Sequence, residues 1–262
     1  MSAPAQSEQS PGSARQGTYV YAILPADIEL TEEISGVGDP PGQVRIIRHG
    51  ALAALASDVE LSRPLGTPDD LRAHEKVVDA SAAEVPVLPM RFGAVLADDD
   101  AVAQELLAGH QDELAADLAD LEGRAEYIVR GRYEEQAILA EILSENPEAA
   151  QLREQIAGKE PDATRDARIR LGEIISGAVA VKREQDTVAL GERMEGRAVA
   201  SLVRDPTHER DAVNVAFLLD RSQDAALAEA VAELAEDWAG RVDLRLLGPL
   251  AAYDFAGMAR GG

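Results

Sequence analysis

The chain has 262 residues and no cysteine, and its 48 acidic and 25 basic side chains give a formal net charge of −23. The lack of cysteine excludes disulfides, thiolate catalysis and cysteine-ligated zinc. The strong negative charge repels phosphate backbones and anionic lipid headgroups, so we expect neither nucleic acid nor membrane as a partner. An apolar fraction of 46% can build a sizeable core, and the length favours two domains.

The N-terminal residues 1–17 are rich in serine, proline, glutamine and glycine, which predicts a disordered tail. They contain no apolar stretch of the kind that a secretory signal carries. No run elsewhere approaches the ~20 apolar residues that a membrane span needs. We therefore expect a soluble, cytoplasmic protein.

The first structured segment is expected to form a small sheet. Residues 18–24 are apolar on both faces, as in a central strand. A loop is predicted over 27–42, closed by an Asp-Pro-Pro-Gly sequence. Residues 43–48 follow as a second strand, and 52–59 as a third strand or a short helix.

A helix is predicted to open at Thr67, whose hydroxyl can cap the amide of Asp70. Pro68 suits the first helical position, and the carboxylates of Asp69 and Asp70 suit the positive end of the helix dipole. The core-facing stripe is expected to contain Leu71, Val78 and Ala82. The helix should end near Val85, before a proline-flanked strand over 87–96.

A second helix is predicted to start at Asp98 and to run to about residue 122. No lysine or arginine occurs between Phe92 and Gly123, so this helix presents an acidic face. The three aspartates at 98–100 lack the spaced acids and terminal glutamate of a calcium loop, which favours a helix start over a cation site.

The second half of the chain begins with a strand over 124–133, in which charged residues alternate with apolar ones. Helical stretches follow at 134–143 and 148–157. The proline-free stretch 162–203 has a coiled-coil-like seam made of Ala167, Leu171, Ile174, Ala178, Val181 and Val188. This pattern predicts an antiparallel helical hairpin that packs within the domain.

A strand over 213–219, a helix over 223–238 and a strand over 242–247 complete the pattern. The fold class is therefore α+β with two domains, an N-terminal sheet-and-helix domain at 18–122 and a ferredoxin-like domain at 123–256. The helical hairpin is an insertion in the second domain, and residues 257–262 are a short tail.

Several short motifs are distinctive beside the alanine- and leucine-rich helices. They are Tyr-Val-Tyr-Ala-Ile at 19–23, Arg-Pro-Leu at 63–65, Arg-Ala-His-Glu at 72–75, Pro-Val-Leu-Pro-Met-Arg-Phe-Gly at 86–93, Glu-Tyr at 126–127, Leu-Gly-Pro at 247–249 and Tyr-Asp-Phe at 253–255. With these motifs the sequence resembles the gas vesicle protein family GvpL/GvpF. The stretch at 86–93 is the most specific of them. The tryptophan and proline pair that family members often carry after Gly-Pro are absent here.

The resemblance implies a minor, accessory protein of gas vesicles, the hollow protein shells that some prokaryotes assemble for buoyancy. It implies that the protein binds the hydrophobic shell subunit GvpA, possesses no active site or cofactor, and assists nucleation and assembly of the vesicle. It also implies a two-domain α+β architecture with a ferredoxin-like second domain.

The motifs at 63–75 and 86–93 gather polar residues that could do chemistry. His74 beside Glu75 invites an acid/base interpretation, but adjacent helical side chains point ~100° apart. Arg91 could hold a partner's carboxylate, or it could bridge to Asp69, Glu75 or another acid and lock the helix against the next strand. We interpret one set as a fold-defining motif, namely Arg63, Thr67, Asp69, His74, Glu75, Arg91 and Phe92.

Two functions follow from these residues. The first is the assembly protein, for which Asp112, Glu113 and Asp117 on the acidic helix are candidate partner-binding residues. The second is a small-anion-binding or enzymatic α+β domain that uses His74, Glu75 and Arg91. No metal-ligating set of histidines and acids is predicted, because the four histidines are scattered.

Overall fold

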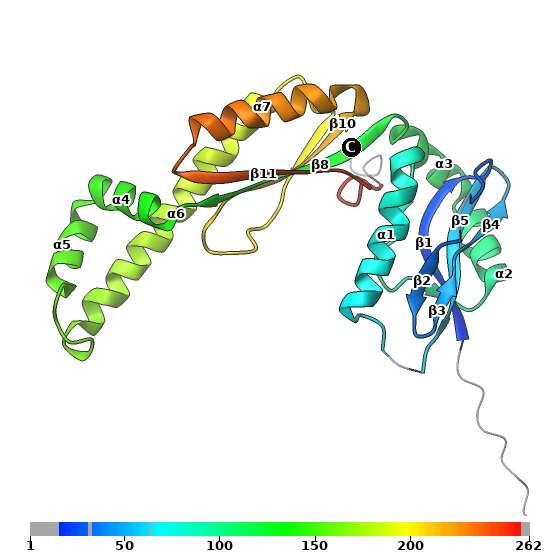
Figure 1. Cartoon of the computed structure of the whole chain (residues 1–262), viewed down its shortest axis with the longest axis horizontal. Coiled ribbons are helices and arrows are strands. Elements are labelled where there is room, and N and C mark those ends of the chain that lie inside the picture. Colours follow the sequence, from blue (N-terminus) through cyan, green and yellow to red (C-terminus); the bar gives the residue numbers. More distant parts are fainter. Residues whose placement is uncertain (1–15, 31–32, 63, 258–262) are drawn as a thin grey trace, which may run out of the picture. The chain divides into compact units, whose positions relative to one another are not determined.

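The computed structural model describes residues 16–30, 33–62 and 64–257 (Figure 1). The chain folds into two compact units. The first contains the residues up to Glu122 together with those from Ala251 on, and the second is Gly123–Leu250. The C-terminal segment therefore contributes to the first unit, whereas the expected range of the second domain extends to residue 256.

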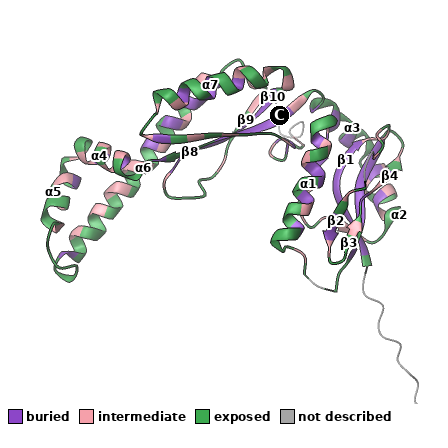
Figure 2. Cartoon of the chain, viewed as in Figure 1, coloured by how far each residue is buried: buried purple, intermediate pink, exposed green. Residues whose placement is uncertain are grey.

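The first unit is built on an antiparallel sheet whose central strand is β1. Its order is β4-β5-β1-β6, and β7 also pairs with β1. The strands are β1 Gln16–Pro25, β4 Arg45–His49, β5 Leu52–Glu60, β6 Leu88–Pro89 and β7 Val95–Leu96. The burial of eight consecutive residues of β1 confirms the prediction of a central strand (Figure 2). The strand begins at Gln16, inside the range predicted as a tail, and residues 1–15 lie outside the described residues.

The loop predicted over 27–42 contains a small hairpin of β2 Ser35–Gly38 and β3 Pro41–Gln43. The loop prediction is wrong at these residues because the hairpin has its own anchor in the core. Val37 is fully buried, and its backbone N–H donates to the hydroxyl of Tyr21 over 2.7 Å. The glycines and prolines that predicted a loop supply the turn of this hairpin.

Helix α1 Pro68–Glu84 covers the sheet of the first unit, and its start is the predicted one. Thr67 accepts from the amide of Asp70 in a capping box, with Pro68 in the first turn. The core face differs from the prediction at Leu71, which is 42% exposed. Asp70 turns inward in its place, and its carboxylate accepts hydrogen bonds from loop amides at Gly38, Gly66 and Thr67. The buried residues of the helix are Asp70, His74, Val77, Val78 and Ala82.

The helix predicted from Asp98 to about 122 is interrupted. It consists of α2 Asp99–Ala101, the π-helix η1 Val102–Ala108 and α3 Gln111–Asp120. The wide π turn places residues five apart on one side, and Val102 and Leu107 are both fully buried.

The second unit contains an antiparallel sheet of order β11-β8-β10-β9. Its strands are β8 Arg124–Tyr133, β9 Ala200–Val203, β10 Asp211–Asp220 and β11 Val242–Leu250. One face packs against helix α7 Asp224–Asp237 and the last turns of helix α6, which together form a hydrophobic core. Short 3-10 turns, η2 Asp162–Thr164 and η3 Arg221–Gln223, precede α6 and α7.

The long helical region is α4 Glu135–Glu145, α5 Pro147–Ile156 and α6 Arg165–Met194. Asn146 caps α5 by accepting from the amide of Ala149, which explains the break at Pro147. Helix α6 packs against both α4 and α5, and it ends at Met194, within the proline-free stretch 162–203. The residues that follow form β9, an edge strand that was not predicted.

The predicted seam of α6 holds only in its first half. Val181 and Val188 are more than half exposed, whereas Lys182, Asp186, Leu190 and Met194 are buried. The buried positions are four apart, so the contact face shifts by one residue after Ala178. This shift occurs because Lys182 and Asp186 satisfy their charges with partners on neighbouring elements.

Candidate functional site

His74 lies at the centre of the first unit and joins three segments of the chain. Its Nδ1 is 2.9 Å from the hydroxyl of Tyr19 on β1, and its Nε2 is 3.0 Å from the hydroxyl of Tyr253 in the C-terminal segment. The hydroxyl of Tyr19 also accepts from the backbone N–H of Gly93 over 3.1 Å. His74 is 3% exposed and Tyr19 is fully buried, whereas Tyr253 is 38% exposed, so the imidazole itself is shielded from solvent.

Burial controls the ionisation of this cluster. It lowers the pKa of His74, and a backbone hydrogen bond with Met90 opposes the shift. Burial also raises the pKa of Tyr19 to about 12. A neutral imidazole offers one donor and one acceptor, and two hydroxyls can satisfy both whichever nitrogen carries the proton.

Aromatic rings enclose the imidazole. The ring of Tyr21 stacks on it with centroids 5.8 Å apart, and the ring of Phe92 meets it edge-on at 5.6 Å. Tyr19 contacts both Tyr21 and Phe92. The arrangement leaves no room for a substrate beside the imidazole, and it links α1 to the segment at 86–93.

Asp70 holds the loops in front of α1. Its carboxylate accepts from the backbone N–H groups of Gly38, Gly66 and Thr67 at 3.1–3.3 Å and from the hydroxyl of Thr67 at 2.8 Å. Charge-assisted bonds of this kind are about twice as strong as neutral ones. The carboxylate therefore serves the fold and has no free position for a ligand.

The structure does not bring His74, Glu75 and Arg91 together. Glu75 and Arg91 are exposed, and neither side chain forms an ion pair or hydrogen bond with any part of the chain that the structure describes. The predicted bridge from Arg91 to Asp69 or Glu75 is therefore wrong. Asp69 pairs instead with Arg72, three residues along the same helix, over 2.6 Å. Arg63 lies outside the described residues.

The acidic surface of the first unit lies on α3. Asp112 and Glu113 are exposed, and Glu113 lies 3.3 Å from Nδ1 of His110. Asp117 is only 5% exposed, so its proposed role as a surface contact is wrong. The helical period explains the error, because Asp117 shares its face with the buried Leu114 and Leu118.

The aspartates before α3 have structural partners. Asp98 caps α2 by accepting from the amide of Ala101 over 2.8 Å. Asp99 accepts from Nε of Arg45 over 3.0 Å, and this guanidinium lowers the pKa of the carboxyl. Across the described ranges, no group of three or more histidine and acidic side chains could hold a metal ion.

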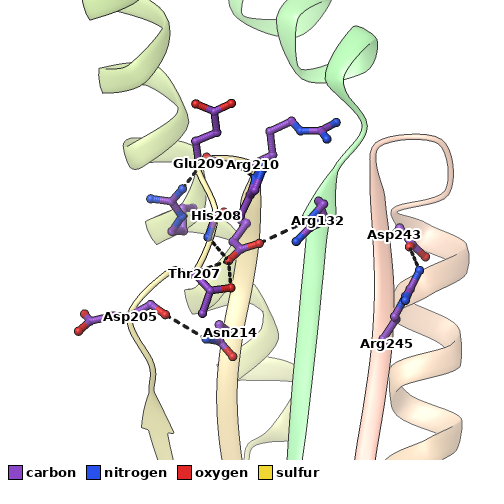
Figure 3. A network of polar contacts seen from close by, with 11 residues as sticks. Arg132, Asp205, Thr207, His208, Glu209, Arg210, Asn214, Asp243 and Arg245 are labelled. Carbon is purple, nitrogen blue, oxygen red and sulfur yellow. Dashed lines mark hydrogen bonds and ion pairs between the residues drawn. The ribbon is translucent and has the colours of Figure 1, made fainter. Parts of the chain in front are cut away.

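A second polar network lies in the second unit, around the start of β10 (Figure 3). The Asp211 carboxylate accepts from Thr207 N–H, Thr207 hydroxyl and His208 N–H at 2.7–2.9 Å. Burial raises the pKa of Asp211, but these bonds outweigh it and lower the pKa overall. Its other carboxylate oxygen is 3.6 Å from Nε of Arg132 on β8.

Sequence reasoning missed several of these residues. Nothing connected Tyr253 to His74, because 179 positions separate them. Asn214 was also missed, although it is the single polar residue in the apolar run 212–219 and so carries a signal. A buried polar residue in an apolar strand needs a hydrogen-bond partner, so this position could have been identified from the sequence.

In the described part of the chain, no helix has both the length and the apolar character needed to cross a membrane.

The comparisons with known proteins agree over nearly the whole sequence. The family profile "Gas vesicle synthesis protein GvpL/GvpF" matches residues 17–257. A protein named Gas vesicle protein F from a Streptomyces species is 37% identical over 91% of this chain and 98% of its own length. Another of that name from Dolichospermum flosaquae is 24% identical over 91% of this chain and 96% of its own length.

Solved structures show the same fold. The crystal structure of the gas vesicle protein GvpF from Anabaena superposes with a TM-score of 0.75 at 24% identity, and covers 93% of this chain and 98% of its own. The GvpF structure from Microcystis aeruginosa gives 0.73 at 22% identity, over 92% and 98%. Both likenesses support a mixed fold of helices and antiparallel sheets. From the profile match and the Streptomyces relative, the chain belongs to the GvpL/GvpF family of gas vesicle synthesis proteins.

Proposed function

We propose that the chain is an accessory protein of gas vesicles that acts in the cytoplasm and at the vesicle. It binds the hydrophobic shell subunit GvpA and assists nucleation and assembly of the shell. The observation that carries this proposal is the family match over residues 17–257, together with the full-length relative named Gas vesicle protein F. The identity of GvpA as the partner is inferred from the family resemblance of the sequence.

We also propose that the protein acts by binding, without a catalytic site or a cofactor. The environment of the three candidate residues supports this. His74 is buried between two tyrosine hydroxyls, while Glu75 and Arg91 face solvent. Acid/base catalysis needs groups within hydrogen-bond reach of one substrate, and these three residues do not converge.

The domain plan fits this family role. We propose that the second unit is a ferredoxin-like domain with a helical insertion. The order β8, helices, β9, β10, α7, β11 and the sheet order β11-β8-β10-β9 support it. We propose that the first unit, residues 18–122 with the C-terminal segment, carries the contact surface for the shell subunit.

The surface we favour combines charge with apolar area on α3. Asp112 and Glu113 supply the exposed negative charge. Beside them, Ala115 and Ala119 line a shallow hollow of about 450 Å³ whose other walls include Ile28 and Pro86. A hydrophobic subunit with a few basic groups would find both attraction and an apolar seat there.

A pull-down of GvpA by the purified full chain tests this surface. At low salt, the double charge reversal Asp112→Lys/Glu113→Lys should weaken retention of GvpA by about three- to tenfold, because steering by surface charge is lost. The matched control Glu229→Lys/Glu236→Lys makes the same charge change on exposed residues of α7 and should bind like the wild type.

The possible results distinguish the proposed binding of GvpA from the proposed location of its binding surface on α3. If both double variants bind equally well, GvpA binds elsewhere and the α3 assignment is wrong. If the wild type retains no GvpA at any salt concentration, the binding function itself is contradicted.

A further inference from the structure

Three arginines, Arg130, Arg132 and Arg245, lie close together on one face of the sheet in the second unit, in a chain of net charge −23. Cross-strand register places them in two adjacent rows. Arg245 on β11 pairs with Arg130 on β8, which pairs with Asn214 on β10. The next row is Asp243, Arg132 and Asp211. Residues two apart on a strand share a face, which places the two rows on one face of β8 and of β11. On β10 the register shifts between Asp211 and Val213, and Asp211 lies 3.6 Å from Arg132 on that face.

The charges of these rows do not balance. Arg132 lies 3.6 Å from Asp211, and Arg245 lies 3.2 Å from Asp243. Arg130 is exposed and, within residues 16–30, 33–62 and 64–257, has no ion pair or hydrogen bond from its side chain. The middle of the face therefore carries a surplus positive charge, in the row that contains Asn214.

Asn214 supplies an independent sign of a ligand. It is only 7% exposed, and its Nδ2 donates to the backbone carbonyl of Asp205 over 3.0 Å. This bond fixes the orientation of the amide, so the oxygen lies on the side away from Asp205 (Figure 3). That buried Oδ1 accepts from no donor among the described residues. A buried acceptor left unsatisfied destabilises the fold, and a bound donor would relieve this cost.

These residues surround one pocket of about 310 Å³, lined by Arg130, Arg132, Thr207, Asn214, Arg245 and Leu247 together with the two aspartates. We call it the arginine pocket. Its chemistry offers guanidinium donors, one carbonyl acceptor and an apolar wall. A carboxylate beside an N–H donor would satisfy both kinds of group at once.

We propose that the arginine pocket binds an acidic peptide segment of a partner protein. A side-chain carboxylate of the segment lies between Arg130 and Arg245, and a backbone N–H of the segment donates to Oδ1 of Asn214. A phosphate fits less well, because Asp211 and Asp243 line the same pocket and repel a second negative charge. The site is separate from the α3 surface and does not depend on binding of the shell subunit.

Amide NMR of the full-length protein tests the proposal with a defined probe. Titration with N-acetyl-glutamate methylamide should shift the side-chain amide of Asn214 and the backbone amides of Arg130 and Arg245 in a saturable manner. The neutral N-acetyl-glutamine methylamide has no carboxylate to pair with Arg130. It should therefore produce shifts at least about tenfold weaker at the same concentration.

Variants connect the shifts to the residues. Arg130→Gln should weaken binding of the glutamate probe about tenfold or more, whereas Arg153→Gln, the same change on an exposed arginine of α5, should leave it unchanged. Arg245→Gln is the second variant if Arg130→Gln does not fold. Absent shifts, equal shifts with both probes, or inorganic phosphate binding as tightly as the glutamate probe would each overturn the proposal.

Discussion

His74 and Glu75 are neighbours on α1 with opposite surroundings. The ~100° step between adjacent helical residues explains why one side chain is buried and the other is exposed. The histidine joins the hydroxyls of Tyr19 and Tyr253, so it connects β1, α1 and the C-terminal segment. In this respect the histidine of the family motif organises the fold of the first unit.

A matched pair of variants measures this role. His74→Ala removes a buried ring and leaves two tyrosine hydroxyls without their partner, so we expect a loss of about 2–4 kcal/mol in the free energy of unfolding. Glu75→Ala, on the exposed side, should change it by less than about 0.5 kcal/mol. Denaturant unfolding of both variants gives the comparison. Equal effects would show that His74 is not part of the core.

The lowered pKa of His74 predicts how stability depends on pH. In the unfolded chain the imidazole gains its proton near pH 6.5, whereas in the folded chain burial delays protonation to lower pH. Above about pH 6.5 both states are neutral and this residue adds no pH dependence. Below that pH the unfolded state binds more protons, so the folded state loses stability, by at most about 1.4 kcal/mol per pH unit.

The His74→Gln variant isolates this contribution. It cannot take up the proton, so the stability gap between wild type and variant should narrow as the pH falls from about 7 to 5. Chemical unfolding of both proteins across this range measures the gap. A gap that stays constant or widens on acidification would contradict the buried, neutral histidine.

At the scale of elements, α6 shows where a sequence pattern stops being informative. The apolar spacing up to Ala178 predicts the packed face, but the face then passes through Lys182 and Asp186. Lys182 donates to Glu141 and Glu145 at 2.6 and 2.7 Å, and Asp186 accepts from the hydroxyl of Tyr133 and from Arg241. An apolar pattern cannot reveal these polar contacts, which connect the two helices α4 and α6 with the end of β8 and the residue before β11.

Two substitutions distinguish the observed face of α6 from the predicted one. Leu190→Ala should cost about 2–5 kcal/mol because Leu190 is fully buried. Val188→Ala should cost less than about 0.5 kcal/mol because Val188 is 56% exposed. Thermal or denaturant unfolding measures both. A larger loss of stability in Val188→Ala than in Leu190→Ala would show that the seam predicted from the sequence is the packed face.

Some other structural features are determined by neighbouring residues, and others depend on residues that are distant in the sequence. The Thr67 cap, the central strand β1 and the turn at Gly50, where φ is +58°, depend on neighbouring residues and were predictable. The π-helix η1 contacts β4, the edge strand β9 pairs with β10, and the Asp70 carboxylate accepts from Gly38, so these features depend in part on residues farther along the chain. The residues of the candidate site differ in the same way. Asp112 is exposed and Asp117 is buried because of the face of α3 that packs against the core.

At the scale of the whole molecule, the C-terminal segment belongs to the first unit although it follows the second in sequence. Ala251 donates to Asp79 on α1, and Phe255 is 3% exposed. The first unit therefore uses residues from both ends of the sequence. The net charge of −23 favours solubility, which would suit the proposed binding of an apolar subunit.

We propose that this protein binds GvpA and assists its assembly. The most direct measurement is the fraction of GvpA that stays in the supernatant after centrifugation when GvpA is produced with this chain or alone. The proposal predicts that GvpA produced alone sediments, and that with this chain a large part stays soluble and co-purifies with it at low salt. GvpA that sediments equally in both cases, with none co-purifying, would contradict the claim.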